Sequence, residues 1–159
     1  MINRRQLLSY ISQLFAIGLV SKNSYSENSK KFIKNTIPSS KQELPAIGMG
    51  TWITFNVGNN KSLIEQRRLV LQDFFNYGGE LIDSSPMYGS SEKVVGECLQ
   101  NLKKKQRLFS ATKVWTPSTR HGKIQIENSL DLWKIKSFSL LQVHNLVNVE
   151  KHLEHLTFL

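Results

Sequence analysis

Apolar residues recur along this chain in two alternating patterns that together predict a strand–helix repeat. Four short apolar runs bounded by turn residues are typical of buried strands, and they cover residues 44–52, 80–83, 107–114 and 138–143. Helical spacing of apolar residues follows each run, over residues 62–77, 91–102, 124–134 and from about 149 onward. Such alternation indicates an α/β fold with a parallel sheet and right-handed crossovers. Ahead of the repeat, residues 32–37 are predicted to pair with residues 44–47 as a hairpin.

Each predicted helix has an apolar face that we expect to pack on the sheet. In the first helix this face consists of Leu63, Leu69, Val70, Phe74 and Tyr77. In the second helix it consists of Val94, Val95, Cys98, Leu99 and Leu102. The chain has one cysteine, so we expect a small core residue there and exclude an internal disulfide or a multi-cysteine metal site.

A distinctive residue ends each predicted strand. Gly50, Asp83, Lys113 and His144 follow one another at intervals of 33, 30 and 31 residues. Because the carboxyl ends of parallel strands meet at one rim of the sheet, we expect these residues to lie close together. Parallel α/β folds place their active sites at that rim.

Tyr88 extends this set, because it lies in the turn after the strand that ends at Asp83. A phenol is a weak acid at neutral pH, and a lysine cation nearby would stabilise its phenolate form. Lys113 could take that role if Asp83 holds it in place, and His144 could donate to a substrate oxygen. Such a set suits protonation of an oxygen that gains charge, as in carbonyl reduction. The alternative is a structural Lys113–Asp83 pair beside an ordinary loop tyrosine and a strand-end histidine.

Composition limits the alternatives. The length of 159 residues and the 40% apolar content correspond to one globular domain with a formal charge of +9. The basic run from Lys103 to Arg107 follows a predicted helix and has no interleaved aromatic residues, so we expect a solvated helix end and no nucleic-acid site. No metal site is predicted, because the other histidines lack ligand spacing; these are His121, His152 and His155.

The first 30 residues have the pattern of an export signal followed by a polar spacer. Arg4 and Arg5 precede an apolar run from Leu7 to Val20, which is short for a stable membrane span, and polar residues follow it. The arginine pair resembles a twin-arginine signal, and this predicts export, with a periplasmic location. The alternatives are an N-terminal membrane anchor, or a cytoplasmic protein with a fortuitous apolar N-terminus.

Four segments, in this order, resemble the motifs of the aldo-keto reductases. They are the first-strand segment 44–52, the Asp-Tyr segment 82–89, the lysine strand 111–115 and the histidine strand 141–145. The resemblance covers roughly residues 44–155 and implies a (β/α)8 barrel, of which residues 31–159 would be the first four strand–helix units.

The resemblance also implies a chemistry and a set of roles. It implies NADPH-dependent reduction of a small aldehyde or ketone, with Tyr88 as proton donor. Asp83 and Lys113 would tune Tyr88, and His144 would orient the carbonyl. The positions that would approach the cofactor are Gly50, Thr51, Trp52 and Asp83.

The same resemblance implies a truncated barrel. A complete barrel of this type has about 250 residues, and the family's main cofactor-binding segments follow strands five to eight. We therefore expect these 159 residues to be an inactive N-terminal half. The alternative is a non-catalytic half-barrel whose open sheet edges associate with a second copy or a complementary chain.

Overall fold

The computed structural model describes residues 32–102, 107–116, 118–146 and 149. The chain divides into two units, residues 1–31 and 32–159, and every described residue belongs to the second. The predicted export segment lies outside the described residues, as do the predicted last helix beyond residue 149 and most of the basic run, so these stay predictions. No helix in the described part of the chain combines the length and apolarity needed to cross a membrane.

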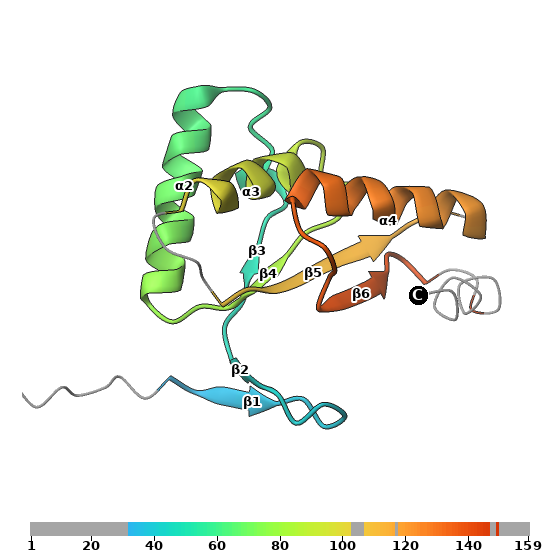
Figure 1. The fold of residues 1–159 in the computed structure, drawn as a ribbon, viewed down its shortest axis with the longest axis horizontal. Coiled ribbons are helices and arrows are strands. Elements are labelled where there is room, and N and C mark those ends of the chain that lie inside the picture. The colour runs from blue at the N-terminus through green and yellow to red at the C-terminus, as the bar shows by residue number, and fades with distance from the viewer. Residues whose placement is uncertain (1–31, 103–106, 117, 147–148, 150–159) are drawn as a thin grey trace, which may run out of the picture. The chain divides into compact units, whose positions relative to one another are not determined.

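A four-stranded parallel sheet forms the centre of the described unit (Figure 1). Its strands lie in chain order, as β3 (Met49–Gly50), β4 (Leu81–Asp83), β5 (Phe109–Val114) and β6 (Leu140–Val143). The neighbouring strands pair in parallel throughout. The predicted α/β class and the order of strands and helices are therefore confirmed.

The N-terminal hairpin is also present, but it divides the long strand predicted over residues 44–52. Strand β1 (Lys34–Thr36) pairs antiparallel with β2 (Glu43–Pro45), and Met49–Gly50 alone joins the parallel sheet. The hairpin pairing continues past Pro45, since the Ala46 N–H donates to the Ile33 carbonyl at 2.8 Å. The single predicted strand is wrong, because its apolar residues serve two different sheets.

Three helices lie on the same side of the parallel sheet (Figure 1). They are α2 (Lys61–Asn76), α3 (Ser91–Gln100) and α4 (Thr119–Trp133), and α3 packs against both of the others. A short 3-10 helix, η1 (Ile53–Phe55), follows β3 and packs against α3. The candidate residues lie at the carboxyl ends of the strands or in the loops that follow these ends.

Two helices begin earlier than their apolar periodicity predicts, because each start is set by a capping side chain. Asn60 accepts a hydrogen bond from the Leu63 N–H at 3.1 Å, so α2 begins at Lys61. Ser118 likewise accepts from the His121 N–H at 3.4 Å, and α4 begins well before the predicted start at residue 124. The first turn of α4 is polar, so apolar spacing gave no sign of it.

The buried face predicted for α2 is wrong. Its buried residues are Ile64, Leu71 and Phe75, whereas Leu69 and Val70 are 50% and 47% exposed. The apolar residues of this helix point to several sides, so their spacing alone could not show which side faces the sheet. The face predicted for α3 is confirmed, since Val94, Val95 and Cys98 are buried.

Helices α3 and α4 approach each other closely at Gly96. A Cβ atom added there would lie 1.9 Å from the backbone oxygen of Leu132, so any side chain would force the helices apart. Cys98, two residues after Gly96, is buried against α2, where its Sγ lies 3.5 Å from the Ile64 carbonyl oxygen, and burial raises the pKa of its thiol to about 12. The thiol therefore stays protonated at neutral pH and is a packing residue.

Candidate active site

The strand ends bring the predicted residues together at one rim of the sheet. Gly50 is in register with Asp83, and on the other side Lys113 is in register with Gln142 of β6. His144 follows β6 directly, and its N–H donates to the Val114 carbonyl at 2.9 Å. This continued pairing fixes the position of His144 beyond the last residue of its strand.

Lys113 and Asp83 form an ion pair in this rim. The Lys113 Nζ lies 2.5 Å from Asp83 Oδ2 and also donates to the Ser84 carbonyl at 2.9 Å. Both side chains are largely shielded, with Lys113 14% and Asp83 30% exposed. The pairing expected from the sequence is therefore present, and its backbone contact aims the ammonium group toward the turn after β4.

The Tyr88 ring is surrounded by three of the predicted residues. The Lys113 Nζ lies 5.3 Å from the ring centroid, and the His144 ring meets it edge-on with centroids 5.8 Å apart. Trp52 approaches the same ring with a centroid distance of 6.3 Å. A positive charge this close to the phenol would stabilise the phenolate left by proton donation. The arrangement can thus donate a proton to an oxygen placed between Tyr88 and His144.

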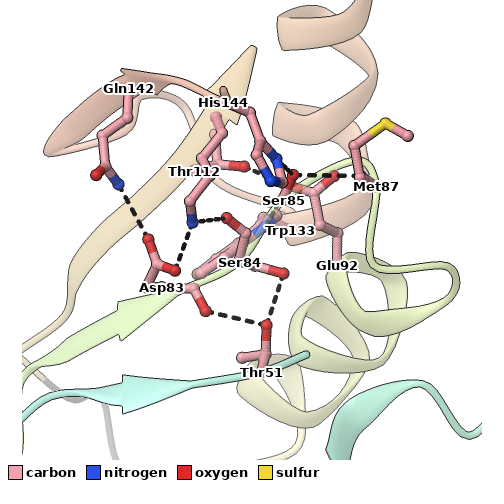
Figure 2. Close-up of polar contacts among 11 residues, drawn as sticks. Thr51, Asp83, Ser84, Ser85, Met87, Glu92, Thr112, Trp133, Gln142 and His144 are labelled. Atoms are coloured by element: carbon pink, nitrogen blue, oxygen red, sulfur yellow. Dashed lines mark hydrogen bonds and ion pairs between the residues drawn. The ribbon is translucent and has the colours of Figure 1, made fainter. Parts of the chain in front are cut away.

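The predicted cofactor positions at the end of β3 differ in whether a ligand can reach them. Thr51 is fully buried, and its hydroxyl is hydrogen-bonded to the Asp83 carbonyl at 3.0 Å and to Ser84 Oγ at 2.7 Å (Figure 2). Its side chain therefore braces the turn after β4. Trp52, by contrast, is 63% exposed, and a Cβ atom added at Gly50 would meet nothing within 4 Å. The open space at Gly50 lets a ligand approach the backbone closely.

Gln142 is a site residue that the sequence did not suggest. Its Nε2 donates to Asp83 Oδ1 at 3.0 Å (Figure 2). Both carboxylate oxygens of Asp83 are therefore held, one by Lys113 and one by Gln142. The available signal was its place in β6. Because side chains alternate along a strand, a polar residue two positions before His144 faces the same side.

Ser85 is the second contact that the sequence did not suggest. It is buried in the turn after β4, and its Oγ lies 2.8 Å from His144 Nδ1 (Figure 2). Ser85 and His144 are far apart in the sequence, so only the parallel arrangement of β4, β5 and β6 brings them together. Sequence spacing could not have shown this contact.

The remaining histidines do not extend the site. His121 is exposed in the first turn of α4, where its backbone takes part in the helix cap. His152 and His155 lie outside the described residues. Within the described ranges, no group of three histidine, cysteine or acidic side chains is placed to hold a metal ion.

Comparisons with known proteins give a consistent assignment. The sequence model of the aldo/keto reductase family matches residues 46–159. Methylglyoxal reductase YeaE of Escherichia coli (strain K12) is 39% identical over 74 residues, which are 45% of this chain and 25% of that protein. The matched residues thus span about a quarter of that relative.

Solved structures agree on the fold. An aldo/keto reductase from Klebsiella pneumoniae in complex with NADP and acetate aligns with a TM-score of 0.65 and 23% identity, over 79% of this chain and 45% of that one. The thermostable aldo-keto reductase Tm1743, in complex with the inhibitor epalrestat, also gives a TM-score of 0.65, at 22% identity, over 80% and 49% of the two chains. At these identities the similarity concerns the fold, and this chain spans about half of each structure.

The family match and the fold agree with the order of motifs along the chain. The four parallel strands correspond to part of the (β/α)8 barrel of this family. The match covers well over half of the sequence, including every predicted site residue. The chain belongs to the aldo/keto reductase family.

Proposed function

We propose that this chain carries the proton-donating site of an NADPH-dependent carbonyl reductase. The proposal rests on one observation: the Lys113 ammonium group and the His144 ring both lie next to the Tyr88 ring at the carboxyl-end rim of the sheet. Tyr88 donates its proton to the carbonyl oxygen as a hydride reaches the carbonyl carbon. The aldehyde or ketone becomes an alcohol, and the phenolate is stabilised by Lys113 until a proton from solvent restores it.

NADPH supplies the hydride when it is bound. The residues present fit one side of such a cofactor, because Gly50 leaves open space beside the Asp83 rim and Trp52 is exposed there. Complexes of the Klebsiella pneumoniae relatives with NADP and NADPH support this choice of cofactor. Lys113 and Gln142 hold Asp83 so that the rim keeps its shape as the cofactor and substrate enter.

The substrate that we propose is a small aldehyde or ketone. The name of the Escherichia coli relative, a methylglyoxal reductase, supports a small dicarbonyl as the first compound to test. Its carbonyl oxygen would take the proton of Tyr88 and a hydrogen bond from His144. Tyr88 and His144 contact only the carbonyl oxygen, so they define the substrate as a class of carbonyl compound and leave the rest of the molecule open.

The test measures deuterium transfer from C4-deuterated NADPH to methylglyoxal. It uses the protein in the form that its source organism makes, beside residues 1–159 purified as a monomer. We expect deuterated alcohol from the first and no turnover from the monomer, because the four parallel strands of the described residues make up half of a closed barrel. Absence of deuterated product from the source form would overturn the reductase proposal. Turnover by the monomer would overturn only the claim that four strands are insufficient.

A second candidate is association through the edges of the parallel sheet. In the described part of the chain β3 and β6 are its outer strands, and Leu140 on β6 is 41% exposed. Unpaired edges of this kind favour pairing with further strands. We propose that residues 1–159 associate with a second copy, with β6 at the contact.

Light scattering after size-exclusion chromatography tests this association. We expect a dimer at micromolar concentration and a shift toward monomer in Leu140→Lys, because a charge on an edge strand opposes pairing. Leu132→Lys is the matched control, since Leu132 is 38% exposed on α4, away from the strand edge. A wild-type chain that stays monomeric, or equal effects of both variants, would count against association through β6.

A further inference from the structure

The contact between Ser85 and His144 restricts how the histidine carries its proton. Ser85 is 1% exposed, so water does not compete for its hydroxyl group. Its Oγ lies 2.8 Å from His144 Nδ1 and accepts a hydrogen bond from the Met87 N–H at 3.2 Å (Figure 2). Among the described residues, these are the two hydrogen bonds of the hydroxyl group.

Counting protons assigns the direction of the contact. The Ser85 hydroxyl has one hydrogen to donate, and the Met87 N–H already supplies a donor to its oxygen. Among the described residues, His144 Nδ1 is the one acceptor that contacts this hydroxyl group, so the hydrogen points to Nδ1, which must be unprotonated to accept it. In the opposite arrangement two N–H groups would donate to one oxygen, and the buried hydroxyl hydrogen would have no acceptor.

We propose that Ser85 is a positioning residue that holds neutral His144 in the tautomer protonated on Nε2. The inference rests on the proposed function for its catalytic consequence, because an Nε2–H is what lets His144 donate to a substrate oxygen. The same hydrogen bond fixes the rotation of the imidazole ring beside Tyr88. Ser85 acts through His144 and does not itself meet the substrate.

The tautomer can be read without cofactor or turnover. Nitrogen-15 histidine labelling of residues 1–159 and long-range proton–nitrogen correlation distinguish the two tautomers at a pH where the imidazole is neutral. His144→Gln identifies the signal among the four histidines. We expect Nε2 to be protonated and Nδ1 to be a hydrogen-bonded acceptor, and we expect Ser85→Ala to lose the hydrogen-bonded Nδ1 signal. A protonated Nδ1, or an unchanged spectrum in Ser85→Ala, would overturn the proposal.

Kinetics test the consequence in the form of the protein that turns over. Ser85→Ala should lower kcat about tenfold with a smaller change in KM, because a misoriented donor weakens the transition state more than the bound substrate. Ser85→Thr, which keeps the hydroxyl group, should recover most of the loss. Ser110→Ala is the matched control, since Ser110 is also buried and accepts a backbone N–H, from Ser139 at 3.3 Å.

The two measurements separate this inference from the reductase proposal. A protein that lacks reductase activity but shows the Nε2 tautomer would contradict the proposed function and leave the Ser85 contact intact. An active reductase in which Ser85→Ala turns over like wild type, or falls no further than Ser110→Ala, would contradict the positioning role alone.

Discussion

Replacing Tyr88 by phenylalanine is expected to lower kcat for carbonyl reduction by about 10³-fold, the middle of the range for loss of a general acid. The substitution keeps the ring that packs against His144 and Trp52 and removes only the hydroxyl group. The loss should fall on kcat and kcat/KM together, because the proton moves only in the transition state. Initial rates of NADPH oxidation with methylglyoxal measure it, in the form of the protein that turns over.

Tyr77→Phe is the matched control for this prediction. Tyr77 is 67% exposed at the C-terminal end of α2, away from the rim, so its substitution should leave both constants within about twofold of wild type. A Tyr88→Phe enzyme with a raised KM and a normal kcat would show that the phenol binds the substrate without donating the proton. An unchanged kcat/KM would remove Tyr88 from the mechanism.

The residues at the rim could be predicted because the repeat of strand and helix has a regular length. One distinctive residue ends each apolar run, and parallel pairing turns that spacing into proximity for Asp83, Lys113 and His144. This proximity follows from the order of the elements alone, because parallel strands end at one edge of the sheet. It does not depend on the correct boundary of any strand or helix, which explains why errors in the boundaries did no harm.

The contacts that support those residues could not be predicted, because they depend on how side chains meet across different elements. Gln142 reaches Asp83, and Ser85 reaches His144, across the one intervening strand β5, and each pair is 59 positions apart along the chain. A sequence shows the polarity of such residues without showing which neighbour they face. The prediction of the buried side of α2 was wrong for the same reason, since only packing against the rest of the protein determines which of its apolar residues are buried.

Glu92 is the most consequential residue of this unpredicted kind. It lies in the first turn of α3, is 2% exposed, and accepts hydrogen bonds from side chains of two other elements (Figure 2). Its Oε1 accepts from Thr112 of β5 at 2.6 Å and from Trp133 of α4 at 3.2 Å. Its Oε2 accepts from Ser129 of α4 at 2.8 Å. One buried carboxylate therefore joins α3 and α4 to β5, the strand that carries Lys113.

Glu92→Ala is expected to lower the free energy of unfolding by about 4 kcal/mol, because three buried donors lose their acceptor at about 1–3 kcal/mol each and part of that cost relaxes. Urea unfolding of residues 1–159, followed by tryptophan fluorescence, measures the change. Glu97→Ala is the control on the same helix, since Glu97 is exposed, and we expect a change within about 0.5 kcal/mol there. Equal effects of the two substitutions would show that the buried contacts add no stability.

Glu92→Gln distinguishes the hydrogen bonds from the charge. The amide oxygen can still accept from Thr112 and Trp133, and the amide N–H₂ can donate to Ser129 once that hydroxyl rotates to accept. All three contacts are then kept as neutral hydrogen bonds, which are roughly half as strong as charge-assisted ones. We expect Glu92→Gln to cost about 1–2 kcal/mol, between wild type and Glu92→Ala. A glutamine as destabilising as alanine would mean that the negative charge, near the N-terminal end of α3, is what this junction requires.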